Sequence, residues 1–395
     1  MNFHAHDPLK PAGRDERVYG IGCASPRTYD VRLTERVLDP AHGALARHLA
    51  GRKALLVTTP TVAALYGDQL ARFIAEAPGV AASLLVLECT EEKKTLAEVA
   101  AVCREALARG LDRRSALVGV GGGVCTDIVS VAAAGIRRGI GCVRVPTTLI
   151  GQIDAGIGLK GAVNFSGKKS YMGCFYPPEA VFVDPAFLRT VPVPLMAFGF
   201  AEIIKMALVR DHRLFKLVEA HHAQLIASRF EAPLEEGRQV LRLAIKRMLE
   251  ELETNPYEDR TYKRLVDMGH TFSPALEAAS GFTMHHGQAV AIDTALTVTL
   301  CEQLGLLAKA ERDRVIALIR AVGLPVTSEL LTLDRCRQGL DEAVLHRGGA
   351  VNLVAPTAIG EATFIERREA VTNELLEQAL ARLAVDAAAP GMVAA

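Results

Sequence analysis

The first half of the chain alternates short apolar runs with amphipathic segments, and this order restricts the possible folds more than any other feature. The apolar runs are short and end in turn residues, as buried parallel strands do, and the segments between them have helical spacing. The predicted strands are 53–60, 82–89, 115–123 and 142–148, and the predicted helices are 61–77, 95–111 and 125–139. A repeated strand–helix order predicts a doubly wound, Rossmann-like parallel sheet.

The second half has a different texture. Helical periodicity dominates at 201–227, 235–253, 287–305 and 309–323. Three prolines between Asp184 and Pro194 separate the two halves. We therefore expect an α/β domain at 1–190 and an α-helical domain at 191–385, with a flexible tail at 386–395 and about fifteen flexible residues at the N-terminus.

Composition excludes several classes of protein. The 395 residues carry 45 basic and 45 acidic side chains, which gives no basic surface for nucleic acid. The N-terminal stretch lacks the apolar core of a secretory signal, and no apolar run reaches transmembrane length, so we expect a cytoplasmic protein without membrane contact. The eight cysteines are scattered without a C-x-x-C pair, which is typical of free thiols.

A glycine turn follows the third predicted strand. Gly121, Gly122 and Gly123 stand between that strand and a helix, where the backbone can approach a phosphate and the helix N-terminus offers free N–H groups. The spacing is neither G-x-G-x-x-G nor a Walker loop, so the turn alone fits nucleotide binding and a simple tight turn equally. Thr147 and Thr148 end the next strand and have the same two interpretations.

Several segments together resemble the sugar phosphate cyclase superfamily, whose best-known member is dehydroquinate synthase. The resemblance covers about residues 50 to 360, with motifs in the right order. They are GGGVCTD, RRGI, PTTLIGQIDAGIGLKGAVNFSGKKSYMGCFYPPE, FAEIIKMAL, GHTFSPALE and HHGQAVAID. The resemblance implies an NAD-binding α/β domain, a helical domain, a divalent metal that is usually zinc (or cobalt), and an active site in the cleft between the domains.

The resemblance assigns three residues to the metal. Glu202, His270 and His286 match the family's ligands. One oxygen and two nitrogen ligands leave positions open for substrate, as a catalytic zinc requires, and the metal would acidify and orient substrate hydroxyls. Without the family context, each of these residues is more often solvated or structural.

The same resemblance assigns further residues to substrate and phosphate. Lysine supplies a point charge to phosphate and arginine a bidentate fork. The matching residues are Asp154, Lys160, Lys205, Lys169, Ser170 and Arg138, the last reaching a neighbouring subunit in the family, which implies a homodimer. Ser170 stands where the family has asparagine.

For NAD, the resemblance selects residues from both sides of the glycine turn. They are Glu91, Lys94, Gly122, Gly123, Asp127, Thr147, Thr148, Lys169 and Thr190. Many relatives carry an aspartate for ribose contacts near the end of the strand that corresponds to 53–60. Here that strand ends in threonines, and Thr58 or Thr59 would have to replace the aspartate.

Three departures from dehydroquinate synthase argue against a substrate with a carboxylate. Pro274 replaces a second histidine in the GHTFSPALE motif. The carboxylate-binding lysine is missing near Leu249, and Lys263 replaces the carboxylate-binding arginine. A buried carboxylate without a cation partner would cost several kcal/mol. If a helix begins near Ser273, Pro274 would stand in its first turn, where proline is tolerated, with Ser273 as the cap; if the helix begins earlier, Pro274 would kink it beside the metal.

The substituted motifs resemble one subgroup, the 2-epi-5-epi-valiolone synthases. These cyclise sedoheptulose 7-phosphate, a small-molecule sugar phosphate without a carboxylate, by transient oxidation with NAD, loss of phosphate, re-reduction and intramolecular aldol closure. Asp293, His346 and Arg347 would lie around the polyol, and Asp293 and Lys263 join Asp154, Lys160 and Lys205 as catalytic candidates. Gln288 stands where many members have glutamate, so it cannot act as a base.

Other functions stay open. Sister enzymes that make 2-epi-valiolone or desmethyl-4-deoxygadusol use the same substrate, and 3-dehydroquinate synthase is a further alternative. A glycerol-type, metal-dependent alcohol dehydrogenase has a related fold, but Lys160 and Lys169 speak against it. A non-catalytic sugar-binding relative would not need all three metal ligands.

Overall fold

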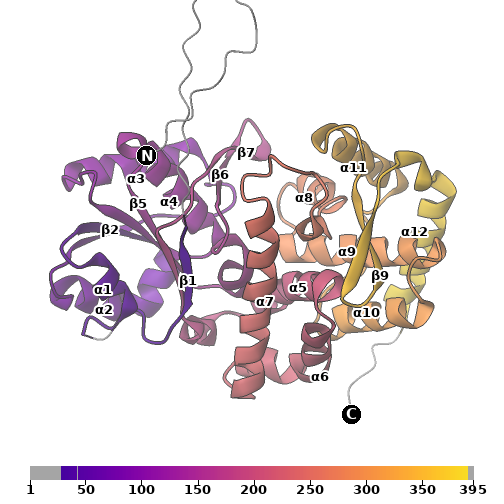
Figure 1. The fold of residues 1–395 in the computed structure, drawn as a ribbon, viewed down its shortest axis with the longest axis horizontal. Helices are drawn as coiled ribbons and strands as arrows, with labels where there is room; N and C mark the ends of the chain where they lie inside the picture. The colour runs from indigo at the N-terminus through magenta and orange to yellow at the C-terminus, as the bar shows by residue number, and fades with distance from the viewer. Residues whose placement is uncertain (1–27, 42, 390–395) are drawn as a thin grey trace, which may run out of the picture.

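The computed structural model describes residues 28–41 and 43–389, so the predicted flexible N-terminus and residues 390–395 lie outside the described residues. An α/β part and a helical part lie side by side, and the long helix α7 (Leu234–Thr254) stands between them (Figure 1). A six-stranded parallel sheet with the order β1-β8-β5-β4-β2-β3 forms the centre of the first part. Its strands are β1 (Asp30–Leu33), β2 (Lys53–Thr58), β3 (Ala81–Val86), β4 (Ala116–Gly121), β5 (Gly141–Pro146) and β8 (Ala180–Val183).

The sequence patterns locate the central strands and their helices correctly. Every residue of β4 and β5 is buried, which explains their continuous apolar runs. The helices are α1 (Ala44–Leu49), α2 (Pro60–Glu76), α3 (Leu96–Ala108) and α4 (Gly123–Gly135). The strand order reverses between β2 and β4, so a crevice opens at their carboxyl ends, where ligands bind in such sheets.

Strands that are very short or polar escape the sequence patterns. β1 and β8 are only four residues each, and β6 (Lys160–Phe165) pairs with β7 (Lys168–Phe175) in an antiparallel hairpin rich in lysine and glycine. The hairpin lies against α4: a Cβ on Gly161 would stand 2.6 Å from the Ser130 Cβ. This close contact fixes Lys160 and Lys169 relative to the glycine turn that precedes α4.

The second part is mainly helical, as expected, but it also contains the hairpin of β9 (Leu353–Ala358) and β10 (Glu361–Ile365). One predicted helix at 201–227 is two helices that meet at Asp211, whose carboxylate accepts from Leu214 N at 3.0 Å. The helices are α5 (Val193–Arg210), α6 (His212–Ser228), α7, α8 (Ser273–Ala279), α9 (His286–Gln303), α10 (Lys309–Ala321), α11 (Leu333–His346) and α12 (Asn373–Ala388).

The predicted tail begins too early. Residues 386–388 are the end of α12, and Asp386 pairs with the buried guanidinium of Arg312. The ion pair removes Asp386 from solvent and extends the helix past the apolar residues that define its pattern.

One large buried cluster crosses the predicted domain boundary. Leu149, Ile153 and Val183 of the first part belong to the same cluster as Phe200 and Ile204 of α5. The division at residues 190 and 191 therefore stays a prediction.

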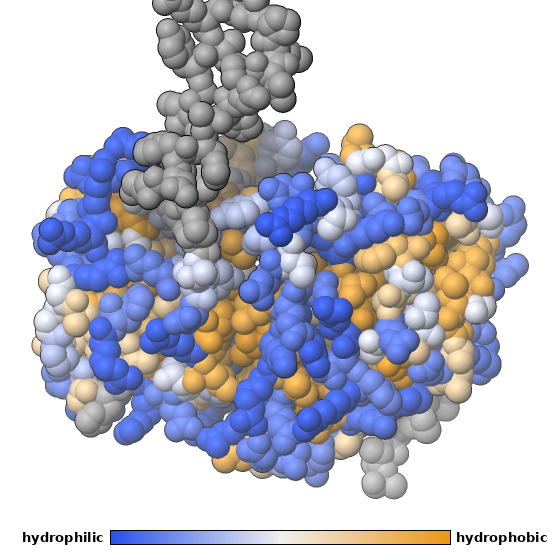
Figure 2. All heavy atoms as spheres, in the orientation of Figure 1, coloured by the Kyte–Doolittle hydropathy of each residue, from blue (hydrophilic) through white to orange (hydrophobic). Residues whose placement is uncertain are grey.

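Among the described residues, no helix is both long enough and apolar enough to cross a membrane, and the seven cysteines described are all free. Hydrophilic side chains cover most of the face in Figure 2, with hydrophobic ones showing between them.

Two glycines let α5 approach its neighbours. A Cβ on Gly199 would stand 2.5 Å from Leu149 Cγ, and a Cβ on Gly287 would stand 2.5 Å from the Phe198 carbonyl oxygen. Gly287 lies next to His286 at the start of α9, and Phe198 lies one turn before Glu202 on α5. The missing side chain at Gly287 therefore allows Glu202 and His286 to meet.

We expect Gly287→Ala to separate α5 from α9, because the new methyl group overlaps backbone atoms that cannot move independently. Overpacking of this kind costs about 1–3 kcal/mol. Thermal unfolding should show the loss of stability, and zinc content after dialysis should fall. Gly67→Ala is the matched control, since nothing lies within 4 Å of its Cβ position inside α2. Wild-type unfolding temperature and zinc content in Gly287→Ala would contradict the role of this close approach.

Candidate metal and substrate site

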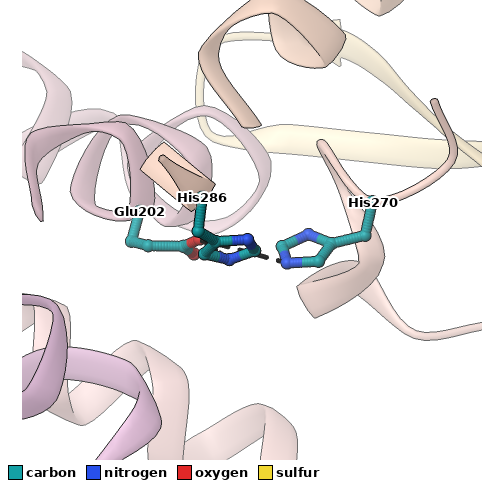
Figure 3. Close-up of side chains that lie close together, drawn as sticks. All are labelled: Glu202, His270 and His286. Carbon is teal, nitrogen blue, oxygen red and sulfur yellow. Dashed lines mark ion pairs between the residues drawn. The ribbon is translucent and has the colours of Figure 1, made fainter. Parts of the chain in front are cut away.

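Glu202, His270 and His286 converge, as the sequence predicts. Their potential ligand atoms all lie within 4.8 Å of one another. The Oε1 atom of Glu202 is 3.2 Å from Nε2 of His286 and 4.0 Å from Nε2 of His270. Glu202 comes from α5, His286 begins α9, and His270 lies in the loop before α8, so three separate segments meet here (Figure 3).

The Glu202 carboxylate is suited to a bound cation. It is fully buried, and neither of its oxygens makes a hydrogen bond of good geometry. Its neighbours are Lys205, an ion-pair partner one helical turn away, and the two histidines. A buried charge is costly unless it is paired or coordinates a metal. One carboxylate and two imidazoles are a ligand set typical of catalytic zinc, so the residues fit this group.

Hydrogen bonds orient both imidazoles toward the same point. Nδ1 of His270 lies 2.9 Å from the Met268 carbonyl oxygen, and Nδ1 of His286 lies 2.9 Å from Oε1 of Glu277. A proton on each Nδ1 leaves Nε2 free as the ligand atom. Both Nε2 atoms are the ones nearest Glu202, so the tautomers that these hydrogen bonds favour are those that a metal requires.

The sequence patterns do not reveal the role of Glu277. Its second oxygen pairs with Lys169 of β7, so the carboxylate joins a histidine predicted to bind the metal to a lysine predicted to bind phosphate. Although burial opposes it, His286 and Lys169 lower the pKa of Glu277 to about 2. Only its place in the GHTFSPALE motif marks it in the sequence. The structure therefore adds Glu277 to the site as the residue that orients His286.

The two histidines differ in protonation. Burial, helped by the charge of Lys205, lowers the pKa of His270 to about 4. Burial also opposes a proton on His286, but the nearby carboxylates of Glu202 and Glu277 raise its pKa to about 9. In the metal-free protein at neutral pH, His286 is therefore charged and His270 is neutral.

Asp154, Lys205 and Lys160 gather near this cluster. Asp154 lies in the single π-helical turn at 151–155, where burial and then the charge of Glu202 raise its pKa. Lys205 is 2% exposed, and the carboxylates of Glu202 and Asp154 raise its pKa despite burial. Lys160 begins β6, and the buried Arg144 donates to its carbonyl oxygen at 3.2 Å. The structure thus brings these predicted catalytic residues together.

Asp293 and Arg347 are already occupied by the protein itself. Asp293 is fully buried, and its Oδ2 accepts from the backbone N–H groups of Thr271, Phe272 and Ser273 at 2.5–2.9 Å. Arg347 donates to the carbonyl oxygens of His270 and Val351. Both side chains hold the loop that carries His270. Their predicted contacts with the substrate stay a prediction, while their observed contacts are structural.

Other predicted substrate residues lie further from the cluster. Lys263 is nearly half exposed and pairs with Glu366 at 2.6 Å. His346 is exposed at the end of α11, and Arg138 is exposed in the turn after α4. Ser170 is exposed, and its hydroxyl accepts from Lys94 at 3.4 Å. Within the described part of the chain, no hydrogen bond or ion pair joins any of these four to the predicted metal ligands, and their roles stay predictions.

An ion pair joins two of the predicted NAD residues to each other, and a hydrogen bond joins a third to the β6–β7 hairpin. Lys94 is buried and pairs with Asp127 of α4 at 2.5 Å, and Asn164 of β6 donates to the Glu91 side chain at 3.0 Å. Burial raises the pKa of Asp127 even beside this lysine. Both pairs lie around the helix that follows the glycine turn, so residues distant in sequence share one surface.

The glycine turn itself is tightly enclosed. Gly122 caps α4, and a Cβ there would stand 3.2 Å from Thr148 Cγ2, while one on Gly123 would stand 3.1 Å from the Ala155 Cβ. Thr147 is buried beside it, its N–H bonded to the Gly121 carbonyl oxygen at 3.0 Å. The predicted phosphate contact is therefore with backbone N–H groups.

The threonines proposed for ribose contacts have protein partners. Thr58 donates to the Val120 carbonyl oxygen at 2.8 Å, and Thr59 caps α2 by accepting from Val62 N at 3.2 Å. The hydroxyl of Thr190, another residue predicted to contact NAD, lies 2.8 Å from the Tyr66 hydroxyl. Either of these two oxygens can donate, so a ligand can share this hydrogen bond more easily than those of Thr58 and Thr59.

Pro274 lies in the first turn of α8, which begins at Ser273. Proline costs little there because its missing N–H has no partner within the helix. Ser273 does not cap the helix, because its hydroxyl is buried without a partner. The Asp293 carboxylate caps the helix instead, by accepting from Ser273 N.

The side-chain oxygen of Gln288 accepts a hydrogen bond from His285 N at 3.1 Å, so Gln288 orders the backbone next to the predicted ligand His286.

Comparison with known proteins identifies the family of this site. The 3-dehydroquinate synthase N-terminal model matches residues 84–197, and the 3-dehydroquinate synthase C-terminal model matches residues 199–342. The chain therefore belongs to the 3-dehydroquinate synthase family, a family of sugar phosphate cyclases.

Within that family, the chain is similar to 2-epi-5-epi-valiolone synthases. It is 41% identical to that of Streptomyces glaucescens, over 97% of this chain and 98% of the relative. A demethyl-4-deoxygadusol synthase of Trichormus variabilis is 33% identical, over 89% and 87%. The solved structure of ValA, the 2-epi-5-epi-valiolone synthase of Streptomyces hygroscopicus, has NAD+ and Zn2+ bound. Its TM-score is 0.88 at 40% identity, over 93% of this chain and 99% of ValA.

We expect Glu277→Ala to raise the zinc dissociation constant about 10- to 100-fold, because His286 loses the partner that orients it. Competition with a chromogenic chelator measures the constant. Glu366→Ala, which removes an exposed carboxylate paired with Lys263, is the control and should leave it unchanged. A change of less than about twofold in Glu277→Ala would show that Glu277 does not support the metal.

Zinc binding should release a proton near neutral pH. His286, with a pKa of about 9, must lose its proton before Nε2 can bind the metal, whereas His270, at about 4, has already lost it. Zinc affinity should therefore rise about tenfold per pH unit from pH 7 and level off near pH 9. Calorimetry at pH 7 in buffers of different ionisation enthalpy should give about one proton per zinc. Release of no proton would contradict the assigned protonation of His286.

Proposed function

We propose that the protein converts sedoheptulose 7-phosphate to 2-epi-5-epi-valiolone with loss of phosphate. The observation that carries the proposal is the near full-length likeness to 2-epi-5-epi-valiolone synthases, including a solved structure with NAD+ and Zn2+ bound. The assembled Glu202, His270 and His286 cluster supports it, since it offers a zinc site at the meeting point of the two parts of the chain.

The residues near the cluster fit the needs of such a reaction. When bound, NAD would remove and later return a hydride, and zinc (or cobalt) would polarise substrate oxygens. Glu202, His270 and His286 would hold the metal, and the turn at Gly122 and Gly123 would face the cofactor phosphates. The protein contributes position and charge to a reaction whose redox step belongs to the cofactor.

Lysines and Asp154 would orient the sugar phosphate. Lys160 and Lys169 lie on the two paired strands of the β6–β7 hairpin and would supply positive charge for the phosphate. Lys205 and Asp154 lie deeper, where a buried ammonium and carboxylate can hydrogen-bond substrate hydroxyls. Burial and the charge of Glu202 raise the pKa of Asp154, which favours exchange of a proton with a substrate hydroxyl.

The active form in this proposal is a cytoplasmic homodimer. Arg138 would complete the phosphate site of the partner subunit, as the family resemblance implies. Its exposed position after α4 leaves the guanidinium accessible to a second subunit. The cytoplasmic location rests on the sequence alone.

A phosphate-release assay tests the proposed function. We expect the purified protein with sedoheptulose 7-phosphate, NAD and zinc to release inorganic phosphate without net accumulation of NADH. Glu202→Gln, which removes one metal ligand, should abolish the release. NADH accumulation without phosphate release would identify a dehydrogenase instead, and phosphate release only from a carboxylate-bearing seven-carbon sugar phosphate would identify a dehydroquinate synthase.

A further inference from the structure

Glu258 places one carboxylate oxygen between two cations from different parts of the chain. Its Oε1 pairs with Nζ of Lys160, at the start of β6, and with Nη1 of Arg264, in the loop after α7. Glu258 has a positive φ of 56°, a backbone conformation that side chains with a Cβ adopt at a cost. The protein therefore holds this carboxylate in place against an unfavourable backbone geometry.

The surrounding loop is ordered by its own contacts. Oδ1 of Asn255 accepts from Arg260 N at 3.0 Å, and Nδ2 of Asn255 donates to the Thr261 carbonyl oxygen at 2.8 Å. Next to Glu258, the ring of Tyr257 meets that of Phe175 on β7 edge to face, with centroids 6.0 Å apart. The loop is thus fixed to the same hairpin that carries Lys160.

Arg264 has no charge left for a ligand. Its Nε and Nη2 atoms bind the Asp267 carboxylate at 3.1 and 2.5 Å, and Nη1 faces Glu258. Two carboxylates thus enclose one largely buried guanidinium. Lys160 differs, because its side chain is 57% exposed and an ammonium has three donors, so it can serve Glu258 and a phosphate together.

These groups adjoin the metal site. The Asp267 carbonyl oxygen accepts from His270 N at 3.0 Å, which places Arg264 and Asp267 directly behind a metal ligand. Lys160 lies close enough to Asp154 for its charge to act on that carboxyl group. Glu258 therefore forms part of the surface between the hairpin that carries Lys160 and the loop that carries His270.

We propose that Glu258 is a specificity-determining residue that excludes substrates with a carboxylate. Its own carboxylate neutralises Arg264. This surface therefore accepts the hydroxyl groups of a neutral ketose chain and repels a second anionic group besides the phosphate. Such a group would meet like charge and find no free cation, and repulsion of this kind is how sites reject a close competitor. The inference rests on the proposed function, in which a sugar phosphate binds at this surface.

Binding of two sugar phosphates to Glu258→Gln tests this proposal. Sedoheptulose 7-phosphate lacks a carboxylate, and 3-deoxy-heptulosonate 7-phosphate carries one. Calorimetry on the zinc-loaded enzyme, with NADH in place of NAD to prevent turnover, gives both dissociation constants. We expect the carboxylate-bearing ligand to bind Glu258→Gln about tenfold or more tightly than it binds wild type, and the neutral one to change less than threefold.

Two control variants separate this effect from general changes in charge or folding. Glu76→Gln removes an equivalent negative charge from an exposed pair with Arg72 on α2 and should alter neither constant. Glu258→Asp keeps the charge and should retain the wild-type preference, and thermal unfolding verifies that each variant is folded. A Glu258→Gln preference within twofold of wild type, or an equal change in Glu76→Gln, overturns the role of Glu258 alone. Wild-type protein that binds neither sugar phosphate overturns the proposed function as well.

Discussion

The structure depends on one carboxylate, that of Glu202, which is buried away from solvent. Glu202 lies inside α5 with no exposed surface, and an isolated charge there would cost far more than a single protein interaction returns. Lys205, His270 and His286 surround it, each from a position that the fold has to hold. A divalent cation at this point would satisfy the carboxylate and both imidazoles at once, which makes metal binding and correct packing of α5 against α9 one requirement.

The same requirement extends outward to the other half of the chain. Glu277 orients His286 with one oxygen and binds Lys169 of the β6–β7 hairpin with the other. Glu258 binds Lys160 at the opposite end of that hairpin. Two carboxylates of the helical part therefore hold the hairpin of the α/β part, and the lysines proposed to bind the sugar phosphate are positioned by the segments that surround the metal ligands.

The local patterns of the sequence predict much of the fold but only part of the site. Buried parallel strands such as β4 and β5 are continuous apolar runs, so they are readable, whereas β6 and β7 are polar because one face meets solvent. The family motifs identify Glu202, His270 and His286, which the structure brings together. The local patterns do not reveal the roles of Glu277 and Glu258, because each also binds a lysine of the β6–β7 hairpin more than 90 residues away, and no local pattern encodes such a contact.

Asp293 and Arg347 have structural contacts that the sequence does not reveal. The family resemblance places both residues near the substrate, and that contact stays a prediction. The structure shows that a buried loop carrying a metal ligand needs its own backbone groups satisfied, and these two side chains do so. A charged side chain can therefore belong to an active site by shaping it, without contacting the substrate.

The identity of the product tests the central claim most directly. Carbon-13 NMR of the product formed from sedoheptulose 7-phosphate, with catalytic NAD and zinc, would follow all seven carbons. The account predicts a phosphate-free seven-carbon carbocycle with the configuration of 2-epi-5-epi-valiolone. A linear oxidised sugar that still carries its phosphate would contradict a cyclase altogether, and a different cyclitol would contradict the assigned stereochemistry.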